Sequence, residues 1–204
     1  MRQLGLLITG GMVFLLSMAG CAARPQDREP ARPGYTFNEP YAFIYADKEK
    51  DPHTKIKLLD SWVAQHSDST LMPFAYYDYI VAYSAISDYP QVIVYADKLL
   101  ALGTKIDANS RLVTLADRAG AYRSGCNANA FQTPEAYKEA KDAAYQGLQT
   151  LGEWQKPVAM SDEEFRTNKS SFEMLFNAVS RIADLGMKGD NIANLCIPSN
   201  SHDR

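Results

Sequence analysis

The chain has 204 residues, a mass of 22.7 kDa and a formal net charge of −3. Hydrophobic residues make up 46% and charged residues 22%, close to the globular average, so the composition excludes wholesale disorder. The slightly acidic balance argues against nucleic-acid binding, because nucleic-acid-binding proteins normally carry an excess of basic residues. We therefore expect one ordinary folded domain with a further segment attached, and no nucleic-acid partner.

Residues 1–20 have the pattern of an export signal. Arg2 supplies a positive charge at the start, and residues 4–16 form an apolar stretch that is too short and too rich in glycine for a convincing membrane span. The sequence Met-Ala-Gly-Cys then occupies positions 18–21. It resembles the bacterial lipobox, in which an apolar residue and two small residues precede the cysteine, although methionine replaces the usual leucine.

This resemblance implies cleavage before Cys21 and attachment of lipid to its sulfur and its new amino group. A single acyl chain gives only marginal membrane binding, whereas several chains make release negligible. Ala22, in place of an aspartate, implies sorting to the outer membrane, facing the periplasm. Loss of residues 1–20 removes Arg2 and no acidic residue, so the charge changes from −3 to −4. The alternatives are an ordinary signal peptide cut near Ala19 and an uncleaved anchor.

Residues 21–40 are predicted to be a flexible tether behind the lipidated cysteine. The stretch from 22 to 40 contains four prolines, mixed charges and few apolar groups, and proline blocks helix continuation. At about 3.1 Å per residue, an extended tether would hold the domain roughly 60 Å from the bilayer. The folded domain is therefore predicted to span residues 41–200.

The pattern from Tyr41 onward is helical, with no sustained period of two and no hairpin signal. Seven helices are expected: a short one after residue 39, one following Asp51-Pro52, and five more near 72–86, 90–102, 109–123, 133–151 and 161–185. Cap residues mark several starts, among them Thr133 and the capping box of Ser161 and Glu164. The fold class is predicted to be all-α.

The stretch from residue 73 to residue 104 gives the best case for an internal repeat. Its first helix carries three tyrosines on one face and its second helix three apolar contact residues: Tyr76, Tyr79, Tyr83, Val92, Ala96 and Leu99. This spacing resembles the tetratricopeptide repeat of 34 residues. Ile80, Val92 and Thr104 depart from the family pattern, which has glycine, alanine and proline at those positions.

Weaker units of the same kind cover residues 39–67 and 109–150. The resemblance therefore implies a tetratricopeptide-like α-solenoid of about three helical hairpins plus a C-terminal helix over residues 161–187. Each hairpin would expose an apolar flank that must stack on the next hairpin, so that three or more units share one core. The alternative is a helical bundle without repeats.

In the tetratricopeptide family, a concave groove is lined by the first helix of each hairpin. The resemblance places four groove positions on the central unit: Phe74, Tyr77, Val81 and Ser84. Six tyrosines lie between residues 76 and 95, more than one core face absorbs, so some are expected to face solvent or a ligand. The alternative for any single tyrosine is packing of helix against helix.

Two cysteines remain besides Cys21, and an oxidising periplasm favours a disulfide between Cys126 and Cys196. The alternative is two buried free thiols. His53, His66 and His202 are isolated, without other ligands at a recognisable spacing, so we expect no metal and no cofactor.

No nucleophile or phosphate-binding motif is present, and the protein is predicted not to be an enzyme. The alternative is an enzyme without recognisable motifs, for which a buried carboxylate pair lacking a salt-bridge partner would be the sign. We expect a membrane-anchored periplasmic lipoprotein that acts as a protein–protein interaction or assembly scaffold through its groove, with a protein or peptide partner. In plan it is similar to helical-repeat lipoproteins of β-barrel assembly and to pilotins. The other possibility is a small-ligand or glycan-binding lipoprotein, whose aromatic residues would cluster in a closed pocket.

Overall fold

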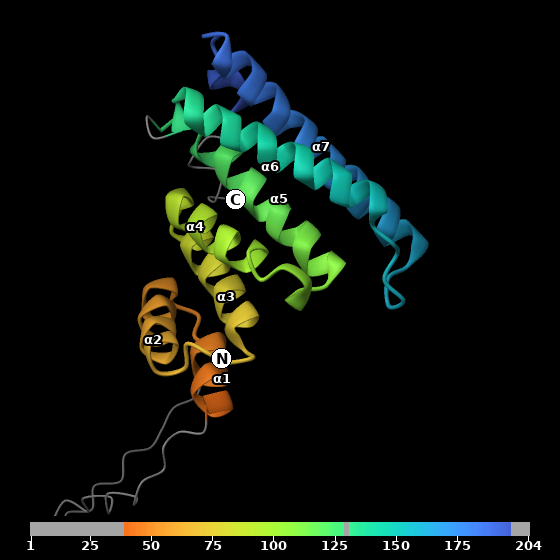
Figure 1. Ribbon diagram of the computed structural model, residues 1–204. Coiled ribbons are helices and arrows are strands. Elements are labelled where there is room, and N and C mark those ends of the chain that lie inside the picture. Colours follow the sequence, from red (N-terminus) through yellow and green to blue (C-terminus); the bar gives the residue numbers. More distant parts are fainter. Residues whose placement is uncertain (1–38, 129–130, 197–204) are drawn as a thin grey trace, which may run out of the picture. The chain divides into compact units, whose positions relative to one another are not determined.

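The computed structural model describes residues 39–128 and 131–196, which form helices and turns without a strand (Figure 1). The α-helices in this part of the chain are α1 (Glu39–Lys48), α2 (Pro52–Gln65), α3 (Met72–Ala85), α4 (Tyr89–Leu100), α5 (Ala108–Gly125), α6 (Pro134–Glu153) and α7 (Asp162–Met187). Two short 3-10 turns are η1 (Gly103–Lys105) and η3 (Ala193–Leu195). The predicted all-α class is thus confirmed. The predicted signal segment 1–20, Cys21 and the tether up to residue 38 lie outside the described residues.

Side-chain caps start the helices where the sequence predicts them. Asp51 accepts a hydrogen bond from the Thr54 backbone N–H at 2.8 Å at the start of α2. Thr133 caps α6 in the same way, and Ser161 forms a capping box with Glu164 at the start of α7. Each cap accepts a hydrogen bond from a backbone amide that the first helical turn leaves unpaired. Because this interaction is local, the sequence predicts where these helices begin.

Several predicted helix boundaries differ from the observed ones by one or two residues. Helix α1 includes Glu39 and Pro40, which the sequence assigned to the tether. The Trp62 indole N–H donates a 3.1 Å hydrogen bond to the Glu39 carbonyl, which ties this first turn to α2. Helix α4 ends at Leu100 and not at residue 102, and Gly103 adopts a positive φ of 62° as η1 begins. Tertiary contacts and turn geometry determine where these helices begin and end, and the local periodicity of apolar residues records neither.

Packing follows chain order. Each α-helix contacts the next, and α1 also contacts α3, α3 contacts α5, and α5 contacts α7. The apolar interior is a series of clusters that share residues: Tyr76, Tyr83 and Tyr95 pack against both the α1–α3 cluster and the α3–α5 cluster. Tyr89 and Ile93 in turn border both the α3–α5 cluster and the α5–α7 cluster. The core therefore extends along the helices without a single centre.

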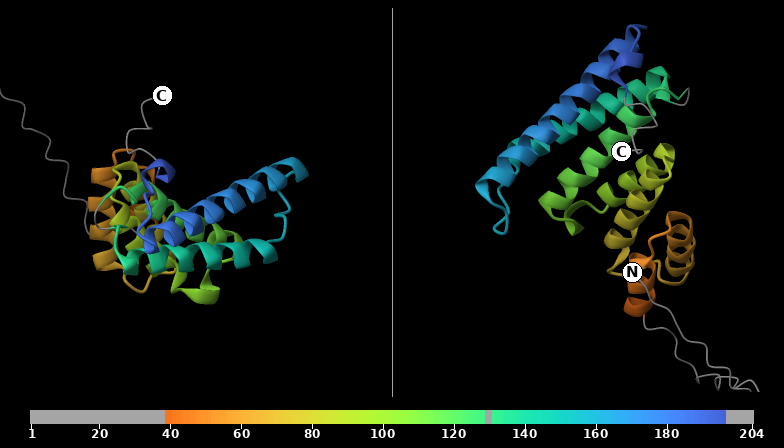
Figure 2. Two further views of the ribbon diagram at one scale, coloured as in Figure 1. Left: turned by 90° about the horizontal axis from the view of Figure 1, so that it is seen from above. Right: turned by 180° about the vertical axis from the view of Figure 1, so that it is seen from behind.

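Helices α6 and α7 lie side by side as a long antiparallel hairpin in both views of Figure 2. Small residues on α6 allow this close approach, since Ala140, Ala143 and Gly147 all face the core around Phe176 of α7. No helix within residues 39–128 and 131–196 combines the length and apolar character needed to cross a bilayer.

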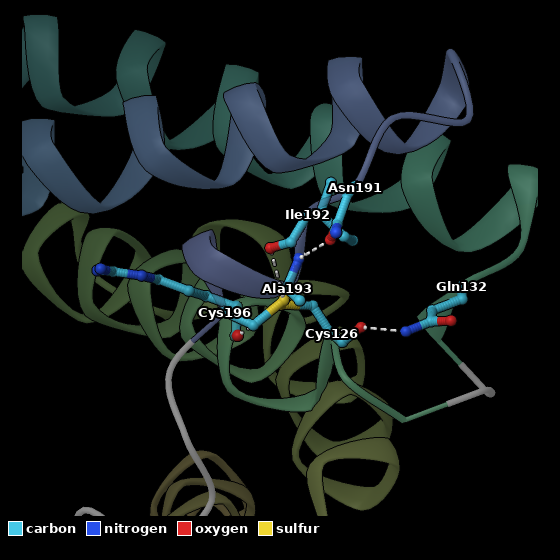
Figure 3. Close-up of a disulfide and its surroundings, with 7 residues drawn as sticks. Cys126, Gln132, Asn191, Ile192, Ala193 and Cys196 are labelled. Carbon is cyan, nitrogen blue, oxygen red and sulfur yellow. Dashed lines mark hydrogen bonds between the residues drawn. A yellow bond between two sulfur atoms is a disulfide. The ribbon is translucent and has the colours of Figure 1, made fainter.

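A disulfide joins Cys126, just after α5, to Cys196, just after η3 (Figure 3). The two Cα atoms are 5.8 Å apart, within the usual range for a disulfide. Ile182 and Ile192 cover the sulfurs, and Gln132 donates a 3.0 Å hydrogen bond to the Cys126 carbonyl. The bridge that the sequence favoured therefore attaches the segment after α7 to the end of α5.

Candidate functional site

Helix α3 carries an exposed apolar stripe. Phe74, Tyr77 and Val81 are 61%, 42% and 45% exposed, and Ser84 at the end of the stripe is half-buried. The opposite face of the helix is buried, with Ala75 and Tyr79 almost inaccessible to solvent. Helix α3 is therefore apolar on two faces, and only one of them is buried in the core. A contiguous exposed apolar patch commonly marks an interaction site.

The other tyrosines of this region pack against one another. The Tyr79 ring stacks on the Tyr95 ring with centroids 4.0 Å apart, and Tyr76 and Tyr83 lie at 6.2 and 5.5 Å from the same ring. The Tyr79 hydroxyl donates a 2.6 Å hydrogen bond to Asp60 of α2. Burial raises the pKa of Tyr79, and the bond to Asp60 adds to this rise. These tyrosines therefore pack helix against helix, although Tyr76 also lines a hollow with Met72 and Leu102.

Helix α5 presents a second stripe next to the first. The stripe consists of half-buried residues that follow one another at helical spacing: Ser110, Val113, Asp117, Gly120 and Ser124. Two hollows lie along the α3–α5 seam, each lined by residues of both stripes. The first hollow, of about 470 Å³, includes Phe74, Tyr77, Ser110 and Val113; the second, of about 400 Å³, includes Ser84, Asp117, Gly120, Ser124 and Phe172 of α7.

Asp117 is the charged residue that lines the second hollow. Its Oδ2 atom is buried and has no hydrogen-bond partner among the described residues. Burial raises the pKa of Asp117 to about 7, because the ionised carboxylate loses its water without gaining a compensating charge. Burial, followed by the charges of Asp117 and Asp78, raises the pKa of Tyr77.

Asp78 of α3 is a second buried carboxylate, but it has a counter-ion. Its Oδ1 atom lies 3.8 Å from the Lys55 ammonium of α2. Burial raises the pKa of Asp78 to about 6, the positive charge of Lys55 lowers it, and Asp47 of α1 raises it. Asp78 thus belongs to the α1–α2 side of α3, whereas Asp117 faces the hollow toward α7. No group of three His, Cys, Asp or Glu side chains suited to a metal occurs in residues 39–128 and 131–196.

The structure bears on the sequence-based site residues in different ways. Phe74, Tyr77 and Val81 are exposed on one side of α3, beside α5. Cys21 lies outside the described residues. The sequence did not single out Asp117, because an aspartate next to Arg118 is typical of a residue on the protein surface. Its position did carry a signal: Asp117 lies one turn after Val113 and one turn before Gly120, on a stripe between two apolar faces of the helix.

Comparisons of the chain with protein-family models, with curated proteins and with solved structures find no match. The function of the site is therefore inferred from its residues and their geometry.

Proposed function

We propose that this protein is a lipid-anchored envelope protein that binds a segment of a partner protein along α3 and α5 and thereby acts as an interaction or assembly scaffold. The observation that carries the proposal is the exposed stripe of Phe74, Tyr77 and Val81. Aromatic and apolar side chains between two hollows provide the contact area that protein partners bury.

A tetratricopeptide-like solenoid is the architecture that we propose for this groove. Contacts between α1 and α3, α3 and α5, and α5 and α7 support it, because alternate helices lie next to one another in stacked hairpins. Core clusters that share tyrosines at their borders support it as well. In this arrangement α1, α3, α5 and α7 would be the groove-lining helices.

Within residues 39–128 and 131–196 the glycan-binding alternative has less support, since the hollow that Tyr45 and Trp62 line offers one exposed aromatic face, Trp62 being almost fully buried. Stacking on a sugar needs exposed aromatic faces gathered in one pocket. The largest aromatic group, around Tyr95, is occupied by its own internal stacking and by the Lys98 ammonium at 4.3 Å from the Tyr95 ring centre.

The groove is tested by site-specific photo-crosslinking in intact cells. A photoreactive phenylalanine analogue replaces Tyr77 in the groove or, as control, Tyr145 of α6, which is 62% exposed. We expect a discrete protein adduct from position 77 and none from position 145. Val81→Asp should abolish the adduct without loss of helical content. Equal adducts from both positions, or an adduct indifferent to Val81→Asp, would contradict the proposal.

The anchor is tested separately by metabolic labelling with palmitate. We expect the wild-type chain to incorporate label and to fractionate with the outer membrane, whereas Cys21→Ser should lose the label and the membrane association. Label retained in Cys21→Ser would rule out the lipobox.

A further inference from the structure

The hollow between α3, α5 and α7 is a distinct part of the groove. It holds about 400 Å³, near the lower end of the range of about 300–1,000 Å³ for ligand pockets. One long side chain fits this size better than a drug-sized molecule. Gly120 forms part of the hollow's wall, and a Cβ placed on Gly120 would have no atom within 4 Å. The space over Gly120 is therefore open to an incoming group.

The residues that line the hollow favour a ligand group that donates hydrogen bonds and carries a positive charge. The buried Oδ2 atom of Asp117 has no partner among the described residues, and buried carboxylate oxygens in proteins are almost always hydrogen-bonded. The hydroxyl groups of Ser84 and Ser124 line the same hollow and can accept further N–H donors. Ca²⁺ fits less well, because it takes six to eight oxygen ligands and Asp117 is the one carboxylate in the lining.

The apolar part of the lining completes the description of the ligand. Phe172 and Leu175 of α7 and Tyr89 of α4 line the hollow. Lysine and arginine side chains bury their aliphatic stems along apolar walls, and their cationic ends interact with aromatic rings. A carboxylate next to an apolar, partly aromatic wall is thus complementary to one of these two side chains.

We propose that this hollow is a specificity pocket for a lysine or arginine side chain of the bound protein segment, with the Asp117 carboxylate as its counter-charge. The inference rests on the proposed function, because it assigns the class of segment that the groove binds. Ser84 follows Val81 by three residues, about 4.5 Å along the helix axis. An extended segment advances about 3.3 Å per residue, so the basic residue should lie one or two positions from an apolar residue that packs on Val81.

The test is a selection of random 12-residue peptides displayed on phage against the purified full-length chain in detergent. We expect the selected peptides to carry a lysine or arginine within two positions of a large apolar residue. Replacing that basic residue in a synthetic peptide by norleucine or citrulline should weaken binding at least tenfold. Against Asp117→Asn, the same replacement should change affinity less than twofold, which is the coupling expected of a direct ion pair.

Two controls separate charge and shape from general damage. Asp190→Asn removes an exposed carboxylate outside the groove and should leave the tenfold preference intact. Gly120→Leu should fill the hollow and remove the preference for a basic residue, whereas Gly152→Leu, which also adds a side chain in open space on a helix, should not.

The outcomes distinguish this inference from the proposed function. Peptides that bind in a Tyr77-dependent manner but carry no basic residue, or whose basic residue is indifferent to Asp117→Asn, would overturn the pocket and leave the groove standing. Failure to select any Tyr77-dependent peptide would overturn both.

Discussion

Gly147 of α6 lies directly against the ring of Phe176 of α7. A Cβ built on Gly147 would be only 2.2 Å from the Phe176 Cε1 atom, far inside van der Waals contact. Gly186 of α7 has the same relation to Tyr137 of α6, at 2.3 Å from the Tyr137 Cζ atom. The two longest helices therefore approach one another through glycines at two levels, each opposite an aromatic ring.

Gly147→Ala should destabilise the protein by about 1–3 kcal/mol, because the added methyl group overpacks a fully buried ring. Gly152→Ala is the matched control in the same helix, since its Cβ would meet no atom within 4 Å. The control should be neutral or stabilising by up to about 1 kcal/mol through helix propensity. Urea unfolding followed by circular dichroism measures both. Equal effects of the two substitutions would contradict the close approach of α6 and α7.

Tyr79→Phe should cost about 1–3 kcal/mol of unfolding free energy. The change removes the 2.6 Å hydrogen bond that the Tyr79 hydroxyl donates to the charged Asp60 carboxylate, while the stack on Tyr95 remains. Tyr76→Phe, on the same side of α3, is the control and should change stability by less than about 0.5 kcal/mol. Thermal unfolding measured on both variants decides whether this hydrogen bond holds α2 to α3.

Asp117 should make the protein less stable as the pH rises. Its pKa is raised to about 7 in the folded chain, whereas an unfolded aspartate ionises near 3.9. The folded state therefore binds the extra proton between these values, so stability falls from about pH 4 to about pH 7 and is constant above. Asp117→Asn removes this loss and should stabilise the protein at pH 8 by about 2–4 kcal/mol. Asp190→Asn controls for the removal of one negative charge.

The comparison is made by denaturant unfolding at pH 5 and pH 8. A stability difference between Asp117→Asn and the wild type that does not grow with pH would show that the carboxylate is well solvated. A variant that is more stable and also loses the preference for basic peptides would mark Asp117 as a residue that serves binding at the expense of stability.

Reduction of the disulfide should lower the unfolding free energy by about 2–4 kcal/mol. The bridge closes a loop of 70 residues, and its loss frees the unfolded chain and uncouples η3 from α5. Cys126→Ala with Cys196→Ala should show the same loss and should no longer respond to reductant. Midpoints of urea unfolding with and without dithiothreitol measure this. Identical midpoints for the wild type in both conditions would contradict a structural role for the bridge.

Much of the helical layout could be predicted because its signals are local. Asp51, Thr133 and Ser161 each satisfy an amide within three residues, so a reader of the sequence can place the helix start without knowing the fold. The disulfide was predictable from cysteine number and the expected compartment. The start of α1 was less predictable, because the hydrogen bond from Trp62 to Glu39 spans 23 residues.

The sequence by itself determined the helical class and the caps, because periodicity and capping are local signals. Its resemblance to the tetratricopeptide repeat implied the candidate stripe of Phe74, Tyr77 and Val81. Only the tertiary structure decided that Asp117 is buried in a hollow with Phe172, a residue 55 positions away. Desolvation of a carboxylate depends on neighbours brought by other helices, and no local pattern records them. The same holds for Gly147 and Phe176, whose contact exists only once α6 and α7 pack together.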